Sequence, residues 1–200
     1  MHGDVVPPES AFVVALMGAE CTGKSTLAQQ LCDALLAQGT RAALVPEVLR
    51  GFCARLGRTP RVDEQQAIAD AQTLSIAQAA ARDPVVIADT TALMTAVYSE
   101  QVFGDTSLYA HAMRDHRACS LTLLAATDLP WQGDRHQRDG PAVRLAVDRL
   151  LRRALDRSGT PYVVVTGIGP ARLQAALAAV RRAMTAPAPP RPVSRGKAGM

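Results

Sequence analysis

Apolar residues follow two patterns along the chain: short continuous runs, and stretches with helical spacing. A short apolar run between turn residues is typical of a buried strand, whereas apolar residues three or four positions apart indicate a helix. Runs of the first kind predict strands at 12–17, 42–45, 85–88, 120–124 and 162–165. Helical spacing predicts helices at 25–38, 48–56, 61–82, 92–102, 107–116, 142–157 and 170–184. Asp63 is a candidate N-cap of the third helix.

The order of these elements predicts the arrangement of the sheet. Strands that alternate with helices form a parallel sheet covered on both faces, which is an α/β fold. Right-handed crossovers bring the carboxyl ends of all parallel strands to one edge. The loops at Gly18, Glu47, Asp89, Thr127 and Thr166 are therefore expected to meet along that edge.

Composition limits the size and the location of the protein. A chain of 200 residues with 48% hydrophobic content fits one domain with a substantial core. We assign residues 11–185 to this domain, residues 1–10 to an N-terminal extension and residues 186–200 to a disordered Pro/Arg-rich tail. The apolar stretches are too short to cross a bilayer, and the first ten residues lack the features of a signal peptide. We therefore expect a cytoplasmic protein without stable membrane association.

Charge and cysteine content argue against two other classes of protein. The net charge is +4, but the tail contributes three of these charges through Arg191, Arg195 and Lys197. The rest of the chain is nearly neutral, so nucleic acid is not an expected partner. The four cysteines show no C-x-x-C pair and no zinc-like spacing, which indicates reduced and mostly buried thiols. Cys21 is the exception, since it lies in a loop that we expect to be exposed.

The most specific motif follows the first predicted strand. Residues 18–25 read Gly-Ala-Glu-Cys-Thr-Gly-Lys-Ser, a complete phosphate-binding loop between a strand and a helix. Its glycines let backbone N–H groups face a phosphate, and the helix N-terminus adds partial positive charge. Lys24 would reach between two phosphates of a bound nucleotide, and the hydroxyl of Ser25 would bind a phosphate-bridging Mg²⁺. The predicted nucleotide-binding residues are Gly18, Ala19, Glu20, Cys21, Thr22, Gly23, Lys24, Ser25 and Thr26.

Two acids stand at the ends of other predicted strands. Asp89 follows the third strand and would reach the Mg²⁺ shell beside Ser25, although an aspartate is also a common turn residue. Glu47 follows the second strand and would accept a proton from, or orient, an attacking hydroxyl, as phosphoryl transfer to an alcohol requires. Alternatively, and with equal weight, Glu47 is an acid at the N-terminus of the following helix that interacts favourably with the helix dipole. Arg50, one turn later, would contact substrate or pair with Glu47.

A polar segment at 131–140, after the fourth strand, brings arginine, histidine and glycine together. Such a segment would close over the nucleotide and place Arg135, Arg138 or Arg144 against the transferred phosphoryl group. A solvated charged loop is the alternative. Tyr98, in a predicted helix, would line the pocket of an aromatic substrate or belong to the core.

Together these motifs resemble the ribosylnicotinamide kinase (NadR-type) family of P-loop proteins. The resemblance covers roughly residues 11–183 and is carried by segments 18–26, 46–52, 89–91, 129–131 and 134–140. It implies a three-layer, adenylate-kinase-like P-loop NTPase fold around a five-stranded parallel sheet. It also implies ATP- and Mg²⁺-dependent phosphorylation of the 5′-hydroxyl of nicotinamide riboside to the mononucleotide.

The resemblance also implies roles for individual positions. Lys24 and Ser25 would hold phosphates and metal, Glu47 and Asp89 would face substrate and Mg²⁺, and Arg138 would belong to the lid. The chain departs from the family's usual W-x-x-D-G lid pattern, because arginine stands at position 135 where glycine is usual. Only ten residues precede the first predicted strand, so a stand-alone kinase is expected.

Three functions remain open on these residues. The leading hypothesis is a small-molecule kinase that acts on a nucleoside-like alcohol, with nicotinamide riboside as the best single candidate. The second keeps the phosphoryl transfer and changes the acceptor to another nucleoside, a nucleotide or a metabolite alcohol. The third is a regulatory nucleotide-binding switch that hydrolyses ATP or GTP slowly. A homo-oligomer is compatible with each of them.

Overall fold

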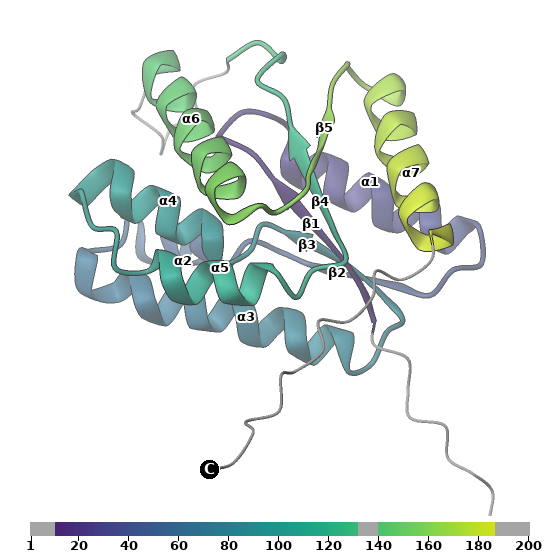
Figure 1. The fold of residues 1–200 in the computed structure, drawn as a ribbon, viewed down its shortest axis with the longest axis horizontal. Coiled ribbons are helices and arrows are strands. Elements are labelled where there is room, and N and C mark those ends of the chain that lie inside the picture. Colours follow the sequence, from purple (N-terminus) through teal and green to yellow (C-terminus); the bar gives the residue numbers. More distant parts are fainter. Residues whose placement is uncertain (1–10, 132–139, 187–200) are drawn as a thin grey trace, which may run out of the picture.

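The computed structural model of the chain describes residues 11–131 and 140–186. Within them, one parallel sheet has the strand order β2-β3-β1-β4-β5 (Figure 1). The strands are β1 (Phe12–Met17), β2 (Ala42–Val45), β3 (Val85–Asp89), β4 (Leu121–Ala125) and β5 (Val163–Val165). The predicted five-stranded parallel sheet is confirmed, and every strand lies within one residue of its expected bounds.

The helices lie where the helical spacing predicted them. They are α1 (Lys24–Ala37), α2 (Val48–Leu56), α3 (Gln65–Ala80), α4 (Ala92–Phe103), α5 (Tyr109–His116), α6 (Pro141–Ser158) and α7 (Pro170–Thr185). One expectation is wrong: the third helix is preceded by a separate 3-10 turn, η1 (Val62–Glu64), and Asp63 does not cap it. Asp63 lies inside this turn and pairs with the side chain of Arg61, while the Glu64 carboxylate accepts the Arg61 N–H at 2.8 Å.

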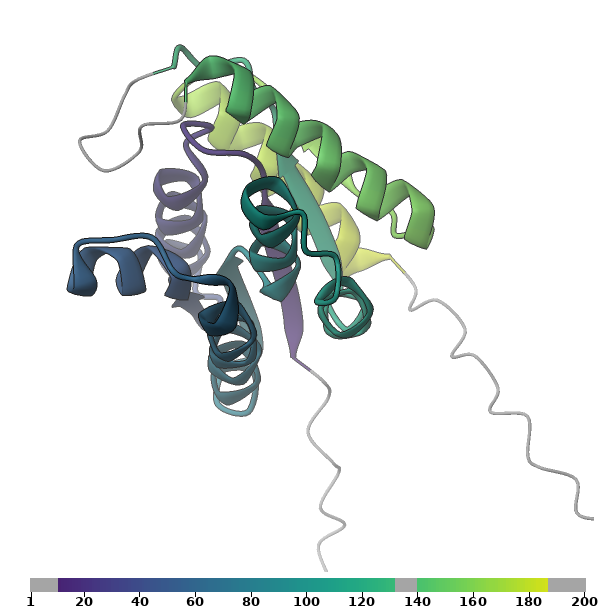
Figure 2. The same ribbon diagram turned by 90° about the vertical axis from the view of Figure 1, so that its left-hand side faces the viewer.

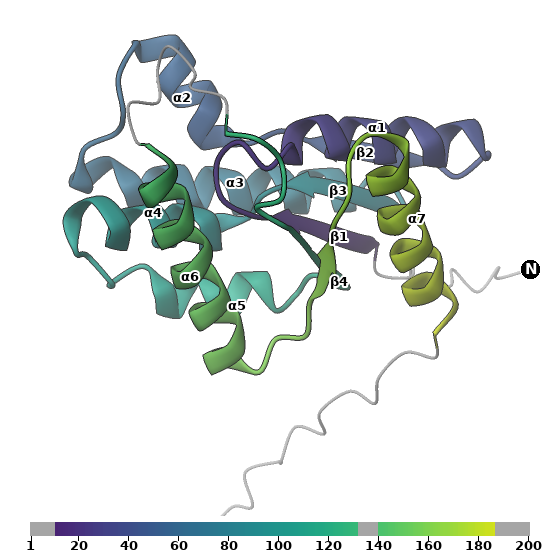
Figure 3. The same cartoon turned by 90° about the horizontal axis from the view of Figure 1, so that it is seen from above.

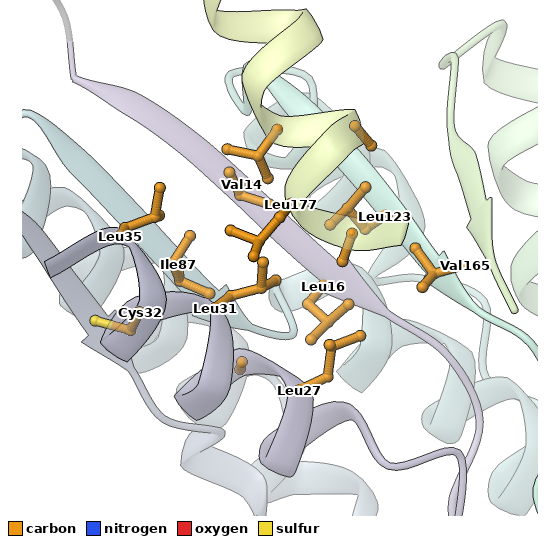
Figure 4. Close-up of a cluster of buried hydrophobic side chains, with 14 of the residues drawn as sticks. Val14, Leu16, Leu27, Leu31, Cys32, Leu35, Ile87, Leu123, Val165 and Leu177 are labelled. Carbon is orange, nitrogen blue, oxygen red and sulfur yellow. The ribbon is translucent and has the colours of Figure 1, made fainter. Parts of the chain in front are cut away.

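Alternating side chains of the strands divide the core into two layers. Val14 and Leu16 of β1 pack with α1 and α7 on one face of the sheet, the cluster drawn in Figure 4. Ala15 and Met17 pack with α4, α5 and α6 on the other face, and α3 covers the same face further along, near β2. This alternation is the period of two that a strand imposes, and burial on both faces explains the continuous apolar runs.

The register of the sheet brings the strand ends together. Leu16 lies opposite Asp89 in the pairing of β1 with β3, and Val45 lies opposite Ala88 in the pairing of β2 with β3. The phosphate-binding loop, the turn at Glu47 and the turn after Asp89 therefore leave the sheet at the same edge. Helix α2 stands away from the sheet at this edge (Figures 2 and 3), and none of its residues is buried.

The environment of the cysteines differs partly from expectation. The four cysteines, all within the described residues, form no disulfide, and only Cys32 is buried, whereas Cys21, Cys53 and Cys119 are half-buried. Cys53 lies on the peripheral helix α2, and Cys119 lies in the turn before β4, which explains their partial exposure. Across residues 11–131 and 140–186, no helix has the length and apolar character needed to cross a membrane.

Candidate functional site

The loop between β1 and α1 is shaped by two glycines. Gly18 has a φ of 146°, and a Cβ at this position would lie 3.0 Å from the carbonyl oxygen of Ala125 and 3.1 Å from Thr22 Oγ1. Gly23 has a φ of 74°, and a Cβ there would lie 3.0 Å from Leu129 Cδ1. Both positions combine a positive φ with close neighbours, so side chains would strain the loop or displace it. The two glycines of the motif are thus required by the geometry of this loop.

Lys24 places a buried ammonium group within this loop. Its side chain is nearly inaccessible, and Nζ donates a hydrogen bond of 2.7 Å to the carbonyl oxygen of Ala19, which also accepts a 2.7 Å bond from Thr22 Oγ1. Burial lowers the pKa of Lys24, while the nearby carboxylates of Glu47 and Asp89 act in the opposite direction. A desolvated cation fixed beside backbone amides is well suited to bind phosphate.

Two oxygen atoms beside the loop lack hydrogen-bond partners. Ser25 Oγ and Asp89 Oδ1 are both buried, and within the described residues neither has a partner. Buried polar atoms are normally satisfied, and hydroxyl and carboxylate oxygens are ligands that Mg²⁺ prefers. Among the described residues, there is no cluster of three or more His, Cys, Asp or Glu side chains that could hold a metal ion. The pair therefore fits an ion that takes its remaining ligands from phosphate and water.

Glu47 lies in the turn between β2 and α2. It is the N-cap residue of α2, but its side chain makes no capping hydrogen bond. Instead, Glu47 Oε2 lies 3.4 Å from Arg50 Nε, and the Glu47 side chain is 9% exposed. Burial raises the pKa of Glu47 and Asp89 adds to this increase, whereas Lys24 and Arg50 oppose it. Of the two roles predicted for Arg50, the structure shows the ion pair with Glu47.

Glu47, Ser25 and Asp89 line one cavity. Its volume is about 570 Å³, and it extends from the phosphate-binding loop to α2, where Arg50 and Arg55 also line it. A cavity of this size accommodates a small organic molecule. The arrangement thus combines an anion-binding loop, two oxygens suited to Mg²⁺ and a buried acid of raised pKa around one space.

Tyr98 contacts the phosphate-binding loop from α4. Its hydroxyl donates a hydrogen bond of 3.2 Å to the buried carboxylate of Glu20, and its ring packs against the core between α4 and α6. Burial and the charge of Glu20 raise the pKa of Tyr98 well above its usual value. Tyr98 does not line the cavity, so of the two predicted roles the core position fits better.

A buried arginine that sequence reasoning did not single out supports the loop from behind. Arg172 Nη2 donates to the carbonyl oxygens of Thr22 and Ala126, both at 3.0 Å, and Nη1 donates at 2.7 Å to the carbonyl of Gly167 and to Asp128 Oδ1. Asp128 Oδ2 accepts the N–H of Gly167 at 2.7 Å. The Arg172 guanidinium thus connects the loops that follow β1, β4 and β5, where the carboxyl ends of the strands lie. An arginine in the first turn of a helix has no sequence signature that would have revealed this role.

A buried histidine holds the turn after Asp89. His116 Nδ1 lies 2.9 Å from Thr91 Oγ1, and Nε2 lies 3.0 Å from Thr122 Oγ1. Thr91 in turn caps α4 by accepting the N–H of Leu93 at 3.3 Å. Burial lowers the pKa of His116 to about 4, so the ring is neutral at pH 7. It therefore packs as a neutral hydrogen-bonding group that joins the start of α4 to β4.

The predicted lid is only partly described. Arg135 and Arg138 fall in residues 132–139, outside the described residues, so their roles stay predictions. Arg144, at the start of α6, is buried; Nη2 donates at 2.8 Å to the carbonyl oxygen of Leu129, and within residues 11–131 and 140–186 its Nε has no hydrogen-bond partner. Arg144 therefore anchors the first residues of the segment that follows β4.

Comparisons with known proteins identify a matching family and two similar folds. A family model described as an AAA domain matches residues 13–172. A search of curated protein sequences gave no significant match. A crystal structure of NadR protein in complex with NAD and AMP-PNP is similar in fold, with a TM-score of 0.70 and 21% sequence identity over 90% of this chain and 51% of that chain. A structure of NadR protein in complex with NR has a TM-score of 0.71 and 21% identity over 86% of this chain and 49% of that chain.

The similarity to the two NadR structures concerns the fold. The chain spans about half the length of the NadR chains that it matches. The predicted P-loop NTPase architecture is confirmed, and so is the resemblance of the fold to NadR.

Proposed function

Because this chain belongs to the AAA domain family of P-loop proteins, we propose that it is an ATP-dependent kinase that phosphorylates a hydroxyl group of a nucleoside-like small molecule. The observation that carries the proposal is the shared cavity. Ser25 and Asp89, suited to Mg²⁺, and Glu47, a buried acid of raised pKa, line the same space of about 570 Å³ beside the phosphate-binding loop. A nucleotide switch needs no acid beside an acceptor cavity, whereas a kinase does.

In the proposed reaction, each residue has a defined task. The loop amides and Lys24 bind the β- and γ-phosphates of ATP. Ser25, with Asp89 directly or through water, would hold Mg²⁺, which when bound neutralises charge on the phosphate oxygens. The hydroxyl oxygen of the acceptor forms a bond to the γ-phosphorus as the bond to ADP breaks, and Glu47 takes the hydroxyl proton. The raised pKa of Glu47 makes it a stronger base than an ordinary carboxylate.

Nicotinamide riboside is the first acceptor to test, and it would be converted to nicotinamide mononucleotide. The NadR structures with NR and with AMP-PNP, an ATP analogue, support this choice. Because the sequence identity is 21% and only half of the NadR chain is covered, the acceptor is a proposal for this protein. Another nucleoside, a nucleotide or a metabolite alcohol would use the same phosphoryl-transfer residues.

The proposal is tested by measuring ADP release from ATP and Mg²⁺ with a panel of acceptors. Nicotinamide riboside, other nucleosides and nucleotides are added singly, and the phosphorylated product is identified by mass spectrometry. A kinase predicts that one class of acceptor raises ADP release many-fold and yields the phosphorylated alcohol. A slow rate that is the same with every acceptor would instead favour the nucleotide switch.

A further inference from the structure

One buried side chain connects the turns that carry the two acids of the site. Gln72 of α3 is 2% exposed, and its Oε1 accepts the N–H of Val48 at 2.8 Å. Its Nε2 lies 3.5 Å from the carbonyl oxygen of Pro46 and 3.4 Å from that of Thr90. Pro46 and Val48 flank Glu47, and Thr90 follows the last residue of β3. A single amide group therefore binds the backbone on both sides of one acid and next to the other.

The chemistry of an amide suits this position. Its oxygen accepts hydrogen bonds and its NH₂ group donates two, so it can satisfy a backbone N–H and two backbone carbonyls together. A carboxylate would accept but not donate, and an aliphatic side chain would do neither. Glutamine at position 72 is thus matched to the three backbone groups that surround it.

The backbone beside Asp89 needs such support. Thr90 has a φ of 69°, a left-handed conformation that β-branched residues rarely adopt. A strained residue of this kind persists only where its surroundings hold it, and it is found most often at functional sites. Gln72 contributes one of the contacts that hold it, from a helix that itself carries no predicted catalytic residue.

We propose that Gln72 is a positioning residue for phosphoryl transfer, which sets the placement of the base Glu47 relative to Asp89. This inference rests on the proposed kinase function. Glu47 and Asp89 come from neighbouring strands, and the pairing of β2 with β3 ends at Val45 and Ala88, before the two turns begin. The Gln72 amide connects these two turns where the sheet no longer does.

The test compares two substitutions by steady-state kinetics with the acceptor found above. Gln72→Leu removes all three contacts, and we expect kcat to fall about 10- to 100-fold, as for a misplaced catalytic group. The KM for ATP should change less than about twofold, because Gln72 makes no contact with the phosphate-binding loop. Gln72→Glu keeps an acceptor for the N–H of Val48 but loses the amide NH₂ that faces the carbonyls of Pro46 and Thr90, so kcat should fall in this variant too.

Gln66→Leu provides the matched control. Gln66 lies on the same helix and is exposed, and within the described residues its side chain bonds only Asp70, at 2.7 Å. This variant should keep the kinetics of the wild type. A wild-type kcat per folded molecule in Gln72→Leu would overturn the inference while leaving the kinase function intact. If Gln72→Leu does not fold, a wild-type kcat in Gln72→Glu, which lacks the amide NH₂, would overturn it. A wild-type enzyme that no acceptor stimulates would overturn both.

Discussion

Replacing Arg172 by leucine should destabilise the protein by about 3 kcal/mol. The guanidinium is 4% exposed and donates four hydrogen bonds, three of them to backbone carbonyls. Each lost bond from a charged donor costs roughly 1 kcal/mol or more, and removing one member of a buried ion pair costs about 3–5 kcal/mol. The Asp128 side chain is 34% exposed, so water solvates the carboxylate that remains and holds the cost near the lower end of that range.

The assay is urea unfolding, followed by circular dichroism at pH 7. The wild type is compared with Arg172→Leu, Asp128→Asn and the double variant. Asp128→Asn should cost about 1 kcal/mol, because Arg172 keeps its three carbonyl acceptors. The two effects should add to more than the cost of the double variant, since the residues share one ion pair. For a domain of this size, the loss in Arg172→Leu corresponds to a fall in Tm of roughly 6–12 °C.

Arg181→Leu controls for the loss of an exposed arginine on the same helix. Across residues 11–131 and 140–186, the Arg181 side chain makes one hydrogen bond, of 2.8 Å to Gln38 Oε1. Its removal should change the free energy of unfolding by no more than about 0.5 kcal/mol. If Arg172→Leu also stayed within that margin, the assignment of Arg172 as a buried support of the loops would be refuted. Because Arg172 binds the Thr22 carbonyl, its loss should also weaken ATP binding by the folded protein, as titration calorimetry would measure.

Three further predictions concern the site and its surroundings. Lys24→Ala should abolish ATP binding in titration calorimetry without unfolding the protein, and unchanged binding would refute its assigned role. Glu47→Gln should lower kcat about 10²- to 10⁴-fold with little change in the Kd for ATP, and a variant with full activity would transfer the role of base to Asp89. In the wild type, the raised pKa of Glu47 should place the acid limb of the kcat profile above pH 4.5. Burial lowers the pKa of His116 to about 4. Between that pH and about 6.5, the folded state therefore binds fewer protons than the unfolded state, so the free energy of unfolding falls as the pH falls through this window. Urea unfolding should show a loss of about 2 kcal/mol from pH 7.5 to pH 5, and this loss should largely vanish in His116→Gln.

The sequence predicted those features that local patterns encode. Within the described residues, apolar runs and helical spacing identified each strand and each α-helix to within a few residues, because burial on both faces of a parallel sheet needs continuous apolar strands. The phosphate-binding loop was found because its glycines and Lys24 act within one short segment, where Gly18 and Gly23 adopt positive φ. Asp63 was misassigned as a cap because boundaries of helices depend on single hydrogen bonds, here the one from the Arg61 N–H to Glu64.

Only the tertiary structure decided which polar groups work together. Gln72 reaches Val48 across 24 positions of the chain, and Arg172 reaches Thr22 across 150. Neither residue differs in the sequence from other glutamines and arginines on surface helices, since its role depends on burial and on backbone groups brought close by the fold. The strand order and register likewise placed Glu47 and Asp89 at one cavity. Local patterns specify the elements, whereas contacts between distant segments specify the site, because hydrogen bonds and desolvation act through space and not along the chain.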